Sequence, residues 1–180
     1  MKNLLYATFL VLLLLSACTS DQKEGQKSVE FKNVNSSIAQ SFSSLKTVDT
    51  FKIELTGRKP EDMILNFSIK NAAGKEIYRT AIQGTALLGS TDPNVNLSRK
   101  KDQIIFLKTI ADEFFAEDNF LEPAVMPDDK PDQYTPDKAL YEELKKTGLN
   151  GFKYRLGKEN NIYIAWSEKE QRVKVYYNCC

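Results

Sequence analysis

Aromatic and basic side chains alternate near the C-terminus in a pattern that suits ligand recognition. Three short segments there, 152–156, 162–166 and 172–177, alternate apolar residues with polar or aromatic ones. Alternate side chains of a strand point to opposite faces of a sheet, so one set should pack into the core. The other set would then share one face, made of Lys153, Arg155, Tyr163, Lys174 and Tyr176. This face could stack on a sugar or contact a phosphate-bearing lipid or a peptide, although good strand formers on an exposed face would give the same pattern.

A second group of side chains suits a hard metal ion. Asp128, Asp129 and Asp132 cluster in a proline-rich segment, 122–136. Carboxylate oxygens are the ligands that calcium prefers, and these three residues are weak calcium candidates. Their spacing differs from that of an EF-hand loop, which has alternating ligands around a central glycine. A solvated acidic loop, or a structured loop that carries recognition, would also account for them.

The absence of histidine limits catalysis and metal binding. It excludes Ser-His-Asp and Cys-His arrangements and histidine-rich zinc sites. An enzyme built from this chain would depend on carboxylates, Lys, Tyr, Arg or a hard metal. The acids Asp112, Glu113, Glu117 and Asp118 could supply a glycosidase-type pair, but on the polar side of a helix they would equally form a solvated surface. We therefore assign no catalytic residue, and a non-enzymatic role is favoured.

Two adjacent cysteines, Cys179 and Cys180, end the sequence. Neighbouring Cα atoms are about 3.8 Å apart, which is below the usual disulfide range of roughly 4.4–6.8 Å. A bridge between them would be strained. Free thiols, an interchain bridge and a strained ring all remain open.

The N-terminus has the pattern of an export signal. Met1 and Lys2 are followed by an apolar run, Leu4 to Leu15, and by the small residues Ser16 and Ala17 before Cys18. An apolar run of about twelve residues fits a secretory signal and is too short to cross a bilayer as a helix.

Leu15-Ser16-Ala17-Cys18 resembles the lipobox of bacterial lipoproteins, over residues 1–20 only. The resemblance implies cleavage before Cys18, a diacylglyceryl group on its thiol and acylation of its new amine, and two or more acyl chains anchor a protein stably. Thr19, where aspartate typically signals inner-membrane retention, favours the outer membrane. Residues 1–17 would be the signal peptide and 18–28 a lipidated tether. The lipid on Cys18 is the only cofactor expected.

The remaining residues, 29–180, predict a single α+β domain. Alternating apolar residues predict strands at 51–55, 63–69 and 76–83, and three more in the C-terminal segments. A helix is expected from Ser98 to Phe115, and another after Thr135 as N-cap, with Gly148 as its stop. Residues 29–48 are ambiguous: Ile38, Phe42 and Leu45 have helical spacing, but the serines around them weaken a helix. The expected fold is an antiparallel sheet of two meanders with two helices on one face.

These patterns indicate a lipid-anchored module of the cell envelope, facing the periplasm or the cell surface, that binds a protein, peptide or glycan. Nucleic acid is not an expected partner, because the chain carries an export signal and a net charge of only +1. An envelope hydrolase using paired carboxylates and an immunity or inhibitor lipoprotein are the alternatives.

Overall fold

The computed structural model describes residues 33–89, 94–157 and 160–179. All of them belong to one compact unit of the chain, Phe31–Cys180. The lipobox, Cys18, the tether 18–28 and Cys180 lie outside the described residues. No helix in the described part of the chain is long and apolar enough to span a membrane.

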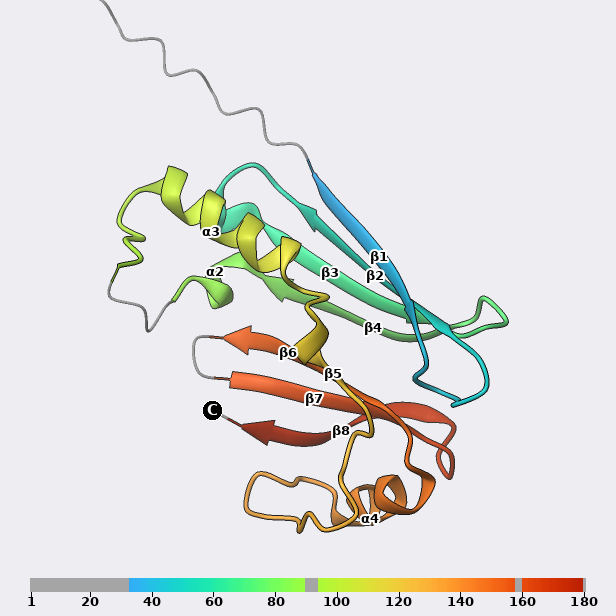
Figure 1. Cartoon of the computed structure of the whole chain (residues 1–180). Coiled ribbons are helices and arrows are strands. Elements are labelled where there is room, and N and C mark those ends of the chain that lie inside the picture. The colour runs from blue at the N-terminus through green and yellow to red at the C-terminus, as the bar shows by residue number, and fades with distance from the viewer. Residues whose placement is uncertain (1–32, 90–93, 158–159, 180) are drawn as a thin grey trace, which may run out of the picture. The chain divides into compact units, whose positions relative to one another are not determined.

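The N-terminal half forms a four-stranded antiparallel sheet, which we call the first sheet. It contains β1 (Val34–Gln40), β2 (Asp49–Thr56), β3 (Ile64–Lys70) and β4 (Glu76–Gln83), in that order (Figure 1). The strands predicted at 51–55, 63–69 and 76–83 are confirmed. Their apolar side chains face inward, because strict alternation places Phe51, Ile53 and Leu55 on the same side of β2.

Residues 34–40 of the ambiguous segment before β2 form a strand, although Ile38, Phe42 and Leu45 have helical spacing. In β1, Ile38 lies opposite Phe51 and Val34 lies opposite Leu55. Serine competes with helical hydrogen bonding, whereas pairing with β2 satisfies the backbone of β1 directly. Tertiary pairing therefore decides the structure here, and Leu45 is exposed in the loop that follows.

The C-terminal half forms the second sheet, also antiparallel. Its strands are β5 (Phe120–Leu121), β6 (Gly151–Gly157), β7 (Asn160–Ser167) and β8 (Arg172–Cys179), in that order. The α+β fold class is confirmed, but the two meanders form two sheets instead of one. Their apolar faces pack against each other, and the rings of Phe51 and Phe152 lie 5.2 Å apart.

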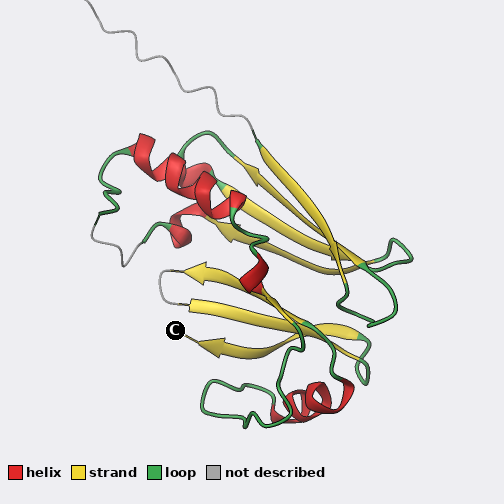
Figure 2. Cartoon of the chain, in the orientation of Figure 1, coloured by secondary structure: helices red, strands yellow, loops and turns green. Residues whose placement is uncertain are grey.

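The helices α2 (Gly84–Leu87), α3 (Lys100–Asp112) and α4 (Lys138–Thr147) are distributed over the fold (Figure 2). Of the two 3-10 turns, η1 (Pro60–Asp62) lies between β2 and β3, and η2 (Glu117–Asn119) lies between α3 and β5. The two main helices do not share one face: α3 contacts β1 and β2, whereas α4 contacts β7 and β8. Each sheet thus has its own helix, because each presents a separate apolar surface to cover.

The main core lies between the sheets and is rich in phenylalanine. Phe67 is fully buried, and its ring lies 5.0 Å from Phe114, 5.3 Å from Phe152 and 5.6 Å from Tyr154. The hydroxyl groups of Tyr78 and Tyr154 share a hydrogen bond of 2.7 Å inside this core. Burial raises the pKa of both tyrosines, so the pair is neutral at physiological pH.

A smaller second core lies on the other face of the second sheet. It joins α4, β7, β8 and the loop from β5 to α4, and its buried side chains are Val125, Leu140, Tyr141, Leu144, Leu149, Ala165 and Tyr176. The apolar stripe of α4 supplies three of these side chains, Leu140, Tyr141 and Leu144. This core lies against the predicted binding face, because it contains Tyr176 and packs against Tyr163.

The ends of α4 follow the sequence signals with one correction. Gly148 ends the helix in the left-handed conformation, with φ of 63°, as expected. The N-cap is Asp137, and not Thr135: the Asp137 carboxylate accepts a hydrogen bond of 2.9 Å from the Leu140 amide. Thr135 is instead buried in the preceding loop, where its hydroxyl accepts a hydrogen bond from the Asp132 amide.

Candidate functional site

The best candidate for a ligand site is a pocket of about 320 Å³ over the second sheet. Four tyrosines line it, Tyr141 from α4, Tyr163 from β7, and Tyr176 and Tyr177 from β8. Leu121 of β5 and four residues of the loop from β5 to α4 complete the lining: Ala124, Asp129, Lys130 and Asp132. We call this space the tyrosine pocket. Its volume is within the range typical of small-ligand sites.

An irregularity in the ladder of β7 and β8 brings two consecutive tyrosines to this pocket. Tyr163 lies opposite Tyr177, but Ile164 lies opposite Val175, so Tyr176 is an extra residue in β8. Consecutive residues of a regular strand point to opposite faces. A bulge redirects side chains locally, and both Tyr176 and Tyr177 line the pocket as a result.

Tyrosine hydroxyl groups hold the proline-rich loop against the sheet. The Tyr176 hydroxyl donates to the Ala124 carbonyl at 2.9 Å, and the Tyr177 hydroxyl donates to Asp132 Oδ2 at 2.9 Å. The Tyr141 hydroxyl makes a longer contact, 3.5 Å, with the Lys130 carbonyl. These hydroxyl groups remain protonated at neutral pH. Burial, and to a smaller extent the hydrogen bond to Asp132, raises the pKa of Tyr177 to about 12.

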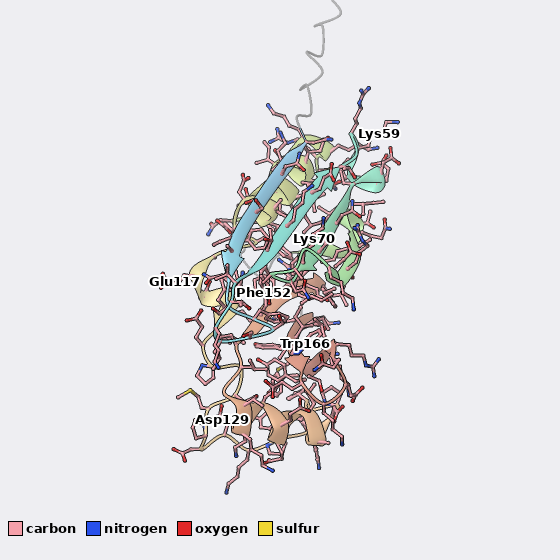
Figure 3. The ribbon with its side chains drawn as sticks, turned by 90° about the vertical axis from the view of Figure 1, so that its right-hand side faces the viewer. Lys59, Lys70, Glu117, Asp129, Phe152 and Trp166 are labelled. Carbon is pink, nitrogen blue, oxygen red and sulfur yellow. The ribbon has the colours of Figure 1, made fainter. Side chains whose placement is uncertain are left out.

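The pocket lies far from the point where the described chain begins. Figure 3 shows Lys59 at the end of the domain where β1 starts and Asp129 at the opposite end, beside α4. Figure 1 gives the same arrangement, with α4 and its preceding loop below the second sheet and the start of β1 above the first.

The predicted binding face is only partly assembled, and Tyr176 is the main correction. Tyr163 is half-buried and lines the tyrosine pocket, with Lys153 directly opposite it on β6. Tyr176 is only 3% exposed, because α4 and the proline-rich loop cover this face of the sheet. It forms the inner wall of a pocket and is not part of an open sheet surface.

The other two cations of the predicted face have structural contacts elsewhere. The Lys174 ammonium group forms ion pairs with Asp137, at 2.5 Å, and with Glu170, and its side chain is only 17% exposed. Arg155 donates to the carbonyl groups of Gly157, at 2.6 Å, and Gly89. The three predicted cations therefore do not form one shared surface.

The acidic segment joins the tyrosine pocket. All three aspartates are exposed, and Asp129 and Asp132 line the pocket whereas Asp128 does not. Their carboxylates also organise the loop: Asp129 Oδ2 accepts from the Met126 amide at 3.2 Å, and Asp132 Oδ1 accepts from the Tyr134 amide at 2.8 Å. In the described ranges of the chain, no three acidic or cysteine side chains are grouped so that they could hold a metal ion.

The acids considered for hydrolysis are not gathered in a pocket that would suit it. Asp112, Glu113, Glu117 and Asp118 are all exposed. A groove of about 400 Å³ beside α4 does contain carboxylates, including Asp137, Glu143 and Glu170. Hydrogen bonds from Lys174 hold the pKa values of Asp137 and Glu170 below the ordinary range, whereas a catalytic acid needs a raised pKa.

The Asp137–Lys174 pair makes a testable contribution to stability. Because its folded-state pKa is lowered, Asp137 should stabilise the fold above its ordinary pKa of about 3.9. This contribution is lost as the pH falls through the lowered value. Asp137→Ala should reduce the free energy of unfolding at pH 7 by at least about 1 kcal/mol, the usual cost of losing an N-cap.

The measurement is urea unfolding at a series of pH values from pH 7 to pH 3, monitored by the fluorescence of Trp166, the single tryptophan. The difference between the wild type and Asp137→Ala should stay constant from pH 7 to about pH 5 and shrink below it, as the carboxyl group becomes protonated in the unfolded chain. Exposed Asp112→Ala is the control, which should match the wild type throughout. A pH-independent difference for Asp137→Ala would rule out the ionic part of this explanation.

Of the two C-terminal cysteines, Cys179 lies within the described residues. Cys179 is disulfide-bonded, while Cys18 and Cys180 lie outside the described residues. The position of Cys179 at the end of β8, opposite Asn161, places it away from the lining of the tyrosine pocket.

Sequence reasoning missed Tyr141 and Tyr177 as pocket residues. Tyr141 belongs to the apolar stripe of the second helix, and Tyr177 falls on the core side when 172–177 is read as a regular strand. The bulge that places Tyr177 at the pocket has no glycine to indicate it.

No protein-family model matches this chain, and neither a curated protein nor a solved structure matches it significantly.

Proposed function

We propose that this protein is a lipid-anchored, non-enzymatic module of the cell envelope that binds a protein, peptide or glycan in the tyrosine pocket. The observation that carries the proposal is the pocket itself: four tyrosines surround a space large enough for a small ligand or a side chain. Tyrosine supplies a large apolar ring with a polar end, a combination that is enriched at recognition surfaces.

The position of the pocket supports its use in an anchored protein. It lies at the end of the domain opposite the start of β1. A chain anchored through Cys18, in the outer membrane as Thr19 suggests, would enter the domain at β1. The tyrosine pocket would then lie at the end of the domain remote from the point where the tether joins it.

The anchor is tested by intact-mass measurement of the protein purified from its native membrane. We expect a chain that begins at Cys18 and carries the mass of a diacylglyceryl group and an additional acyl chain. Cys18→Ser should abolish both the added mass and membrane attachment. An unmodified thiol at position 18, or a chain that keeps residues 1–17, would contradict the anchor.

The binding role is tested by photocrosslinking in living cells. A photoreactive phenylalanine analogue at position 163 should give a light-dependent adduct, whereas the same analogue at Ala81 should give none. Ala81 is a suitable control because it is exposed on β4, in the first sheet. Equal labelling from both positions, or no adduct from position 163, would reject the pocket as the binding site.

The identity of an adduct also separates the remaining alternatives. A crosslinked protein whose activity this domain blocks would identify the immunity or inhibitor role. A glycan or peptide adduct would identify an envelope-binding role. Crosslinking to a molecule that the domain then cleaves would support the envelope hydrolase.

A further inference from the structure

We infer that the tyrosine pocket selects an organic ammonium ion, that is, a protonated amine carried on an aliphatic chain. This inference rests on the proposed function, because it names the class of ligand for the same site. The aromatic faces, the remaining hydrogen-bonding atoms and the carboxylates of the pocket all favour such a ligand.

The first observation concerns hydrogen-bond donors. The hydroxyl groups of Tyr141, Tyr176 and Tyr177 all point their protons at acceptors of the proline-rich loop. A hydroxyl oxygen that donates its proton still has lone pairs with which to accept. These tyrosines therefore offer a ligand mainly acceptors, and a ligand rich in donors complements them.

The second observation is the arrangement of the rings. Tyr163 packs edge-to-face on Tyr177, with ring centroids 5.2 Å apart and planes at 89°. Tyr163 and Tyr176 are 6.1 Å apart at 76°. All three rings line the pocket, and their edge-to-face packing sets them at different angles around this shared space. Because the face of an aromatic ring is electron-rich, such a space attracts a cation.

The third observation is the charge on the loop side of the pocket. Asp129 and Asp132 line it, and in the described part of the chain neither forms a salt bridge with a lysine or arginine side chain. Lys130 also lines the pocket, and like Asp129 and Asp132 it is exposed, so the loop side carries two negative charges and one positive charge. Lys145 donates to the Asp129 carbonyl at 2.7 Å. Burial, and after it the charges of Asp129 and Asp132, raises the pKa of Tyr141, which lines the same pocket.

These features disfavour an anionic ligand. A phosphate or carboxylate would place acceptor atoms against hydroxyl oxygens and carboxylates, and desolvation without new hydrogen bonds is costly. The phosphate-bearing lipid considered from the sequence is therefore a poor fit to this pocket. An ammonium group can instead donate to the carboxylates while its alkyl chain packs on the tyrosine rings.

The test is a calorimetric titration of the mature chain with three probes of similar size: n-butylammonium, 1-butanol and butyrate. We expect saturable binding of n-butylammonium, at least tenfold weaker binding of 1-butanol and none of butyrate. Because the attraction is partly between charges, affinity for n-butylammonium should fall as salt is raised. Spermidine and an N-acetyl-lysine amide then distinguish a free polyamine from a lysine side chain as the natural source.

Two variants confine the effect to the pocket. Asp129→Asn should weaken n-butylammonium binding at least fivefold, while Asp128→Asn, in the exposed neighbouring residue, should leave it unchanged. Urea unfolding of both variants checks that the fold is retained. Equal binding of butyrate and n-butylammonium, no binding of n-butylammonium, or equal effects of the two variants would overturn the inference. If the position-163 adduct forms while n-butylammonium fails to bind, the ligand class is wrong and the binding role stands.

Discussion

Replacing Phe67 with alanine should lower the free energy of unfolding by about 3–5 kcal/mol, the usual cost of truncating a buried phenylalanine. Phe67 has no exposed surface, and its ring contacts both sheets and the segment after α3. Its removal would leave a cavity where the two sheets meet. Because a domain of this size is stabilised by only about 5–15 kcal/mol in total, the variant should be close to unfolding at physiological temperature.

Urea unfolding monitored by Trp166 fluorescence measures the change in the free energy of unfolding, since Trp166 packs against both cores. The control is Ile105→Ala, because Ile105 lies on α3 with 52% of its surface exposed. That variant should change stability by less than about 1 kcal/mol. Similar losses for both variants would contradict the packing of the two sheets around Phe67.

Replacing Gly151 with valine should destabilise the second sheet and distort the tyrosine pocket together. A Cβ atom at Gly151 would lie 2.9 Å from Ala124 Cβ and 2.9 Å from the Tyr176 hydroxyl oxygen. The hydrogen bond between that hydroxyl and the Ala124 carbonyl would have to break or shift. We expect a loss of about 1–3 kcal/mol in stability, as for other overpacked sites, and loss of n-butylammonium binding.

Gly157→Val is the matched control, because Gly157 lies in the same strand. The nearest atom to a Cβ atom there would be the Ala86 carbonyl oxygen, at 3.8 Å, which is an ordinary contact. This variant should keep both its stability and its affinity for n-butylammonium. Equal behaviour of the two valine variants would show that the close approach at Gly151 does not support the pocket.

The sequence predicts most of the strands and the end of α4, because these depend on local patterns. Alternation along 51–55 and 63–69 identifies one buried face in each strand. Gly148 is recognisable because a left-handed residue that ends a helix is usually glycine. The fold class follows from the order of these elements.

Features set by distant contacts are not predictable in this way. The strand β1 has a serine-rich sequence, and only its pairing with β2 makes it a strand. The two residues of β5 are too few to show a period. Lys174 has the spacing of an exposed strand residue, but Asp137 from another element pairs with it.

The candidate site shows the same division between local and distant contacts. Tyr163 and the acidic loop are identifiable as separate features of the sequence, but nothing in the sequence indicates that they share one pocket. Their meeting depends on the bulge in β8 and on hydrogen bonds from Tyr176 and Tyr177 to the loop. The same contacts bury Tyr176, which the sequence pattern predicts to be on an open face.

The most direct test of the tyrosine pocket is to observe its rings during ligand binding. Nuclear magnetic resonance spectra of the mature chain with isotope-labelled tyrosine rings would be recorded as n-butylammonium is added. The account predicts saturable shifts for Tyr163 and Tyr177, and none for Tyr78, which is hydrogen-bonded in the main core. Shifts that never saturate, or that affect Tyr78 as strongly as Tyr163, would contradict it.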